Sequence, residues 1–388
     1  MTSKTRFLVL VVSAPIIAFA VIGGFLGRVI ARDDTYQQLR IFQDVVNLIL
    51  TNYVETADLK RVMSGAMRGL AEGLDPDSSY LLPADVKRLE AGETLPTGET
   101  GLEITRQYYL RVVSARDNSP AAKAGLRPGD LIRAIDQTST RDMSAFEGVR
   151  RLRGTPGSKV TLTVIRGNQA DPHAVELTRE GLTTPDVRGR IQTPGVGYVR
   201  VSAFSRQAAA QLKTQIADLT RQGATSFVID LRGTAAGEYD EAIGAARLFV
   251  GSGTLAVRQA RGTQNQTISA APGDGSIITP ASLLTDIGTS GPAEVFAAAL
   301  KSNKRAELIG ERTLGRTTIQ KLVRLSDGSG LWLTGSRYLL SPPADKRIQA
   351  VEPDVSVDQP DVEFGEALPT TDETLQKAIE RLTQKRAA

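Results

Sequence analysis

A turn between a predicted strand and a predicted helix is where this sequence could support covalent chemistry. The apolar run 282–287 is typical of a buried strand, and Gly288-Thr289-Ser290-Gly291 reads as a tight turn, where glycine adopts dihedrals that other residues avoid. Pro292 suits the first position of a helix, which an alanine-rich run continues to about Leu300. The free N–H groups of such a turn can hold a carboxylate, a phosphate or the oxyanion of an acyl-transfer reaction. That reaction also needs a nucleophile in the turn and a base within reach.

Few side chains of this sequence could serve as that base. The single histidine, His173, lies in a polar stretch that we expect to be the exposed tip of a hairpin. A Ser-His-Asp triad or a zinc site would depend on this one residue, so we expect neither. The chain has no cysteine, which excludes thiolate nucleophiles, thiolate metal sites and disulfides. We expect no metal ion and no cofactor.

The residues after the turn add a resemblance to a known family. Residues 307–320 are predicted to form a second strand-like segment, and the two segments together resemble the catalytic core of the C-terminal processing, or tail-specific, serine peptidases. That family has a serine three residues before the glutamate that opens the helix, a lysine about 25 residues later and a glutamine four residues after the lysine. Here Glu294 opens the helix, and Gly291 occupies the serine position. Arg316 occupies the lysine position, and only the glutamine is retained, as Gln320.

The resemblance also implies an oxyanion loop. Residues 226–232 are a predicted buried strand that ends in Asp-Leu-Arg, and residues 233–237 follow the strand end, where α/β folds place ligands. Thr234 stands where the family has an asparagine. The loop implied by the resemblance comprises Ala236, Gly237 and Pro292, with an amide of Ala236 or Gly237 pointing into the site.

The elements that must position these residues alternate between strand and helix. Residues 197–201 are a predicted strand, residues 208–223 a helix with a terminal glycine, and residues 226–232 the next strand. This alternation predicts an α/β core with largely parallel central strands. We expect the peptidase-like domain to span residues 183–388 and to end in a helix over 372–385.

Residues 95–182 carry a second resemblance. The motif Ser-Pro-Ala-Ala-Lys-Ala-Gly-Leu-Arg-Pro-Gly-Asp at residues 119–130 resembles PDZ domains of the bacterial envelope type. PDZ domains bind an extended peptide as an added strand and hold its terminal carboxylate on loop amides, so the implied partners are protein or peptide C-termini. By resemblance, the peptide-binding loop and edge are lined by Gly101, Leu102, Glu103 and Ile104. Leu102 or Ile104 could instead belong to the hydrophobic core.

The residues before this domain are predicted to be helical over most of 33–94. Apolar residues recur at helical spacing over 35–52, and a second helix is predicted over 58–74. The loop that follows contains Asp75 and Asp77 but lacks the ligand spacing of an EF-hand, so it reads as a capped loop between helices. Its Leu-Asp-Pro sequence also resembles the tail-specific peptidases.

The first residues of the chain predict contact with a membrane. Residues 7–27 carry no charge and form a run of spanning length, and Lys4 and Arg6 precede them. We expect residues 1–32 to be a cytoplasmic stub and a single transmembrane anchor in the inner membrane, with the rest of the chain on the periplasmic side. The alternative is a cleaved signal peptide with Ala18-Phe19-Ala20 as its processing site.

Composition is compatible with this α/β multidomain organisation. A length of 388 residues predicts two or three domains, and the net charge of +4 is mild. Basic residues are spread along the chain and do not cluster with aromatic residues, so we expect no nucleic-acid binding. The sequence does not predict an oligomeric state.

Three functions are compatible with these residues. We favour a peptide-binding pseudopeptidase, because glycine supplies no nucleophile and a guanidinium stays protonated at any working pH. Arg316 beside the amide-rich turn could then clamp a carboxylate. The alternative is an active serine endopeptidase that trims or degrades envelope proteins from their C-termini, with Ser290 as a displaced nucleophile. The third possibility is a scaffold that does not use the groove.

Overall fold

The structure is a computed structural model that describes residues 36–167, 171–182, 185–340, 350–360, 362–366 and 369–387. The chain divides into two units, Met1–Leu70 and Ala71–Ala388, which we describe separately. Residues 36–52 are helical and α2 covers Leu59–Glu72, in agreement with the two predicted helices. Within the described ranges, no helix is both long and apolar enough to cross a membrane. The expected anchor at residues 7–27 lies outside those ranges.

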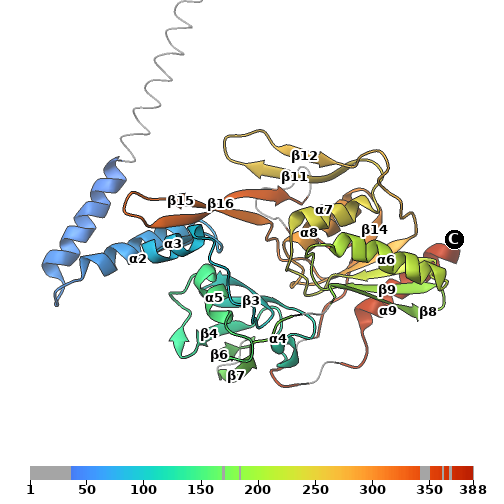
Figure 1. Cartoon of the computed structure of the whole chain (residues 1–388), viewed down its shortest axis with the longest axis horizontal. Helices are drawn as coiled ribbons and strands as arrows, with labels where there is room; N and C mark the ends of the chain where they lie inside the picture. The colour runs from blue at the N-terminus through green and yellow to red at the C-terminus, as the bar shows by residue number, and fades with distance from the viewer. Residues whose placement is uncertain are drawn as a thin grey trace, which may run out of the picture. The chain divides into compact units, whose positions relative to one another are not determined.

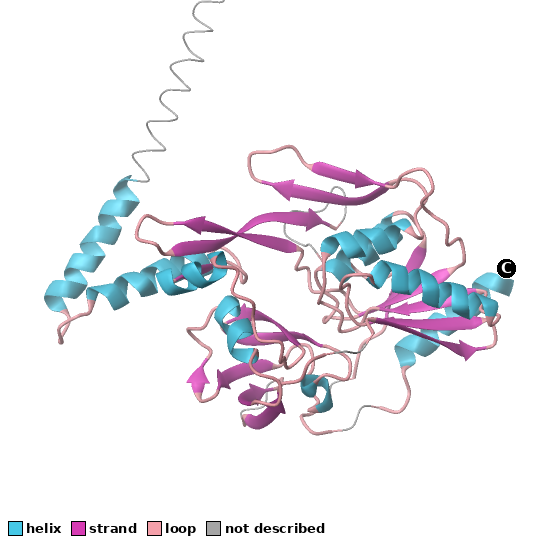
Figure 2. Ribbon diagram, in the orientation of Figure 1, coloured by secondary structure: helices cyan, strands magenta, loops and turns pink. Residues whose placement is uncertain are grey.

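The second unit begins with a small domain built on an antiparallel sheet (Figures 1 and 2). Its strands lie in the order β2-β3-β4-β6-β7, and β5 (Thr138–Ser139) pairs with β4. Their bounds are β2 Leu102–Gln107, β3 Tyr109–Ala115, β4 Leu131–Ile135, β6 Lys159–Ile165 and β7 His173–Thr178. Leu110, Ile132 and Leu162 fill the core of this domain. Because β2 is at the edge of the sheet, one side of this strand has no partner strand.

Two short helices complete this small domain, and both begin at a serine cap. The Ser119 hydroxyl accepts from Ala122 N at 3.2 Å before α4 (Pro120–Lys123), and the Ser144 hydroxyl accepts from Glu147 N at 3.1 Å before α5 (Ala145–Leu152). The expectation that His173 lies at an exposed hairpin tip is wrong. It is the first residue of β7, and its ring stacks on Phe364 with the centroids 4.6 Å apart.

A six-stranded sheet forms the centre of the larger α/β domain. Its order is β17-β14-β13-β10-β9-β8, with every pair from β9 to β17 parallel and β8 antiparallel at the edge. The bounds are β17 Val355–Ser356, β14 Ala306–Gly310, β13 Ala281–Thr285, β10 Ser226–Asp230, β9 Val196–Val201 and β8 Val187–Thr193. The predicted α/β core with parallel central strands is confirmed. The carboxyl ends of β10, β13 and β14 meet at one edge, so the loops that follow them lie together.

Helices cover both faces of this sheet (Figure 1). On one face α6 (Ala208–Arg221) packs against β8 and β9, α8 (Pro292–Ser302) packs against β14, and α7 (Tyr239–Arg247) contacts both helices. Phe227 and Phe296 are fully buried on this face. On the other face α9 (Glu373–Ala387) packs Leu375 and Leu382 against the sheet. Residues 292–300 of α8 are all buried, which explains why this helix is apolar around its whole circumference.

A second sheet joins parts of the chain that are far apart in sequence. β16 (Gly330–Leu339) pairs with β15 (Thr318–Arg324), β1 (Ser79–Leu81) and β11 (Thr254–Ala260), and β12 (Gln266–Ser269) pairs with β11. Helix α3 (Pro83–Glu90) follows β1.

The prediction of one strand-like segment over 307–320 is wrong. β14 ends at Gly310, whose φ of 122° favours glycine, and a Cβ at this position would lie 2.3 Å from the Thr285 carbonyl oxygen. The chain therefore leaves the first sheet at Gly310, and residues 311–317 form a loop that contains Arg316.

Candidate functional site

Gly291 occupies the sharpest point of the turn between β13 and α8. Its φ of 59° and ψ of −119° belong to a region that a residue with a side chain occupies only under strain. A serine nucleophile on a strand-to-helix elbow is held in a strained turn of the same kind. A Cβ built at Gly291 would lie 3.5 Å from the Ala235 carbonyl oxygen and 3.7 Å from the Tyr239 hydroxyl, which are ordinary contact distances. The turn therefore has room for a nucleophilic side chain, and glycine leaves that space unused.

Ser290, the residue before Gly291, makes no side-chain contact within the described part of the chain that would activate its hydroxyl. Its hydroxyl is buried and has no hydrogen-bond partner among the described residues. Its backbone N–H donates to the Thr234 carbonyl at 2.9 Å, which fixes the residue against the oxyanion loop. Without a base in contact, this hydroxyl has no group to take its proton.

Glu294 ties the turn to the loop that carries Arg316. One carboxylate oxygen accepts from Gly291 N and Arg316 N, both at 2.9 Å, and the other accepts from the Thr313 hydroxyl and Gly315 N. This is half of a capping box, because Gly291 has no side chain with which to reciprocate. Burial raises the pKa of Glu294 to about 7, although all four donors act to lower it. Glu294 thus holds the serine and lysine positions of the family at a fixed separation.

Arg316 is held in place by an ion pair that we did not predict from the sequence. Its Nε donates to both oxygens of Asp77, at 2.8 and 3.0 Å, and Asp77 is almost fully buried. The Thr318 hydroxyl also donates to Asp77, at 2.8 Å, and Gln320 Nε2 donates to the Thr318 hydroxyl at 2.9 Å. Gln320 therefore reaches Arg316 only through this chain of hydrogen bonds. Asp75 caps the same loop, because it accepts from the N–H groups of Asp77 and Ser78, as expected.

The loop 233–237 supplies backbone amides at the edge of the site. The Phe204 N–H donates to Ala236 O at 2.9 Å, and Gly237 has a φ of 123° with its Cβ position only 2.3 Å from Phe204 C, so only glycine fits there. Among the described residues, no hydrogen bond uses the N–H of Ala236 or Gly237. Pro292, the third member of the predicted oxyanion loop, has no N–H to donate. The site can therefore offer amides from the loop but none from the residue after Gly291.

Asp286 holds the two halves of this site together. Its carboxylate accepts from Gly233 N at 2.8 Å and from Gly288 N at 2.9 Å, so one side chain fixes both the oxyanion loop and the turn. Burial raises the pKa of Asp286.

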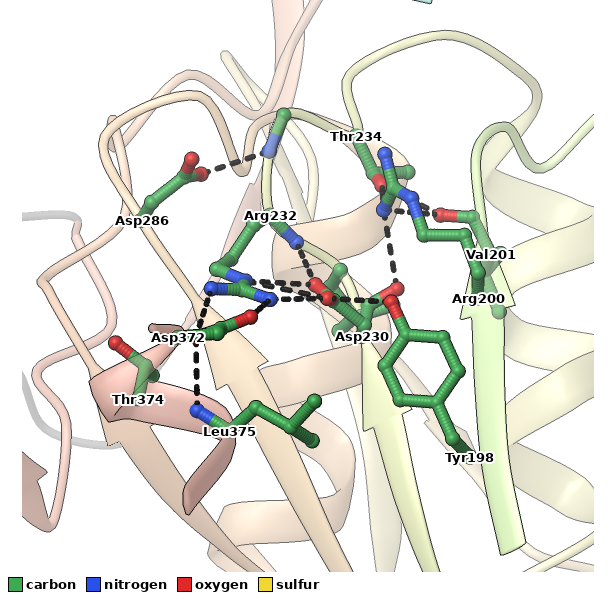
Figure 3. A network of polar contacts seen from close by, with 12 residues as sticks. Tyr198, Arg200, Val201, Asp230, Arg232, Thr234, Asp286, Asp372, Thr374 and Leu375 are labelled. Carbon is green, nitrogen blue, oxygen red and sulfur yellow. Dashed lines mark hydrogen bonds and ion pairs between the residues drawn. The ribbon is translucent and has the colours of Figure 1, made fainter. Parts of the chain in front are cut away.

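A buried charge network lies below the loop 233–237 (Figure 3). Arg232 bridges Asp230 and Asp372, because its Nη2 donates to the Asp230 carboxylate at 2.6 Å and to the Asp372 carboxylate at 2.7 Å. The Tyr198 hydroxyl donates to Asp230 at 2.8 Å. Burial would raise the pKa of Asp230, but the two arginines Arg232 and Arg200 outweigh it and lower this pKa. The network fixes the start of α9 to the strand that leads into the oxyanion loop.

Arg200 extends this network to the small domain. Its Nη1 donates to the Thr234 hydroxyl at 2.9 Å. Its Nε and Nη2 donate to the Asp117 carboxylate at 3.0 and 2.9 Å, respectively. Thr234, which replaces the asparagine of the family, is thus engaged in positioning the loop. We did not predict the roles of Arg200, Asp117 or Asp286 from the sequence, because their contacts join segments that are far apart in the chain.

The predicted peptide-binding residues divide between the core and a cavity. Leu102 and Ile104 are both part of the hydrophobic core of the small domain. Gly101 has a φ of 79°, and a side chain there would collide with Ser119. Glu103 is half-buried, and with Gly101 and Leu102 it lines a cavity of about 260 Å³ that the oxyanion-loop residues Ala236 and Gly237 also line. The predicted peptide edge and the predicted oxyanion loop therefore face a common space.

Comparison with known proteins decides the family. Residues 195–357 match peptidase family S41, and residues 111–166 match the PDZ domain. The carboxyl-terminal-processing protease of Synechocystis sp. is 32% identical over 317 residues, which are 80% of this chain and 74% of that protein. The chain belongs to the carboxyl-terminal processing protease family. Both resemblances expected from the sequence are confirmed, so the small domain is a PDZ domain and the α/β domain an S41 domain.

Other members of the carboxyl-terminal processing protease family match over similar lengths. The carboxy-terminal-processing protease of Bartonella bacilliformis is 30% identical, over 86% of this chain and 80% of that protein. The solved structure of the photosystem II D1 C-terminal processing protease superposes with a TM-score of 0.68 at 29% identity, and the match covers 84% of this chain and 88% of that chain. These relatives are named as proteases. Whether this chain can cleave a peptide depends on the residues that it carries at the catalytic positions.

Proposed function

We propose that this member of the carboxyl-terminal processing protease family binds protein C-termini through its PDZ domain without cleaving them. The observation that carries the proposal is the state of the two dyad positions. Gly291 has no side chain, and Arg316 is paired with Asp77 at 2.8 Å. An arginine cannot act as a general base, because its guanidinium stays protonated. Neither Ser290, without a hydrogen-bond partner among the described residues, nor Pro292, without an N–H, compensates for these changes.

Binding of a free C-terminus is the test of this function. The β2 edge and the adjoining loop support addition of a peptide strand, with its carboxylate on loop amides. A peptide with an apolar last residue should bind the full-length protein with a dissociation constant of about 1 μM, or about 8 kcal/mol. The same peptide with an amidated C-terminus should bind much more weakly when both are measured by calorimetry. Equal binding of the two peptides would count against carboxylate capture.

We further propose that residues 7–27 anchor the protein in the inner membrane, with the PDZ and S41 domains on the extracytoplasmic side. The uncharged run and the basic residues before it support this arrangement. The full-length chain should stay with the membrane fraction after carbonate extraction, and a chain that lacks residues 1–32 should be released. Release of the full-length chain by carbonate would contradict the anchor and favour a cleaved signal peptide.

A further inference from the structure

Two glutamates, Glu99 and Glu103, and two arginines, Arg116 and Arg153, line the cavity between the PDZ edge and the oxyanion loop. Each arginine is already paired, because Arg153 bonds Glu99 at 2.6 Å and Arg116 bonds Asp186. The next arginine near Glu103 is Arg316, which is paired with Asp77. Glu103 lines the same cavity and has no hydrogen bond or ion pair among the described residues. Three arginines thus have three carboxylate partners, and Glu103 is the fourth carboxylate.

The arginines around Glu103 only partly offset the cost of burying its carboxylate. Burial raises the pKa of Glu103, while the positive charges of Arg316, Arg153 and Arg116 lower it and that of Glu99 raises it further. A half-buried carboxylate without a bonded partner gains from any cation that can reach it.

Strand alternation sets where a ligand side chain would meet Glu103. Leu102 belongs to the PDZ core, so Glu103, the next residue, lies on the opposite face of β2, and the strand pairing shifts register only after Glu103. Its partner across the strand pair, Ser114, lines the cavity as well. A peptide added along β2 would place its last side chain on the face of Leu102, near Val149 and Leu152 of α5, and its next-to-last side chain on the face of Glu103.

We propose that this cleft selects C-terminal peptides whose next-to-last residue is lysine or arginine, through an ion pair with Glu103. The inference rests on the proposed function, since it requires that the PDZ edge captures a free C-terminus. It adds a basic residue at one defined position to the requirement for a terminal carboxylate. The ligand side chain would give Glu103 the cationic partner that Glu99 already has in Arg153.

The test uses peptides that differ only in the next-to-last residue. Three peptides of about ten residues, each with a free carboxylate and a terminal valine, carry lysine, alanine or glutamate at that position. Their dissociation constants are measured with the full-length protein in a mild detergent. The lysine peptide should bind at least about fivefold more tightly than the alanine peptide, and the glutamate peptide more weakly than both. The isosteric variant Glu103→Gln should reduce the ratio between lysine and alanine peptides to about one.

A matched variant separates the local effect from a general change in charge. Glu176→Gln removes a carboxylate that pairs with Lys159 on the exposed side of β7, away from the cavity, and should leave the lysine preference intact. Carboxylate-dependent binding without a lysine preference, or a preference that survives Glu103→Gln, would overturn this inference and leave the proposed function standing. Equal binding of free and amidated lysine peptides, or no binding of any peptide, would overturn both.

Discussion

A chain carrying Gly291→Ser, Pro292→Ala and Arg316→Lys is expected to cleave a peptide with a free C-terminus, whereas the wild type is expected to cleave none. The three changes supply a nucleophile, a backbone N–H beside it and an amine that can act as a base. The serine has room because its Cβ would meet its nearest neighbours at 3.5 to 3.7 Å, and the φ of 59° holds it in a strained turn. The triple variant should turn over about 100 times faster than the double variant Gly291→Ser with Arg316→Lys, because only the triple variant has the backbone N–H at position 292.

Asp77 is expected to limit the turnover of the triple variant. A lysine at position 316 would lie beside the carboxylate that now accepts from Arg316 Nε, and this carboxylate would favour the protonated ammonium. Adding Asp77→Asn should therefore raise turnover by a further factor of about 10 or more. Asp77→Asn alone is the matched control and should remain inactive. Cleavage by Arg316→Lys alone would contradict the account, because that chain still has no side chain at position 291.

Replacing Arg232 is expected to cause the largest loss of stability in the S41 domain. Arg232→Met leaves the Asp230 carboxylate buried, and among the described residues the Tyr198 hydroxyl is then its only side-chain hydrogen-bond donor. Removing one partner of a buried ion pair costs about 3 to 5 kcal/mol of the free energy of unfolding. The same change releases Asp372 and with it the start of α9. Urea denaturation followed by circular dichroism measures this loss.

Two further variants identify the cause of that loss. Arg221→Met removes an exposed arginine that pairs with Asp218 within α6, and it should change the free energy of unfolding by about 0.5 kcal/mol or less. Arg232→Met in an Asp230→Asn background should destabilise the protein much less than in the wild type, because no buried charge is left unpaired. An equal loss in both backgrounds would assign the effect to packing and not to charge.

The sequence predicted the parts of the site that depend on local spacing. Residues close together in the sequence encode the glycine turn, the proline at the start of α8 and the alternation of strands and helices. The α/β core and the position of Gly291 could therefore be inferred. Their chemistry could also be read directly, since glycine offers no nucleophile and proline no N–H.

The contacts between distant segments could not be predicted in the same way. Asp77 and Arg316 are 239 residues apart, and no periodicity links them. For this reason the ion pair between Arg316 and the predicted capped loop could not be foreseen. The network from Arg200 to Asp117 and the stacking of His173 on Phe364 are likewise products of tertiary packing.

The central claim, binding without cleavage, is tested most directly by the fate of a bound peptide. A peptide with a free C-terminus and an apolar last residue is incubated with the purified full-length wild type at a concentration that saturates binding. Its mass is then followed by mass spectrometry. We predict that the peptide binds and is recovered intact. A shortened product whose formation is abolished by Ser290→Ala would contradict the account and establish Ser290 as a nucleophile.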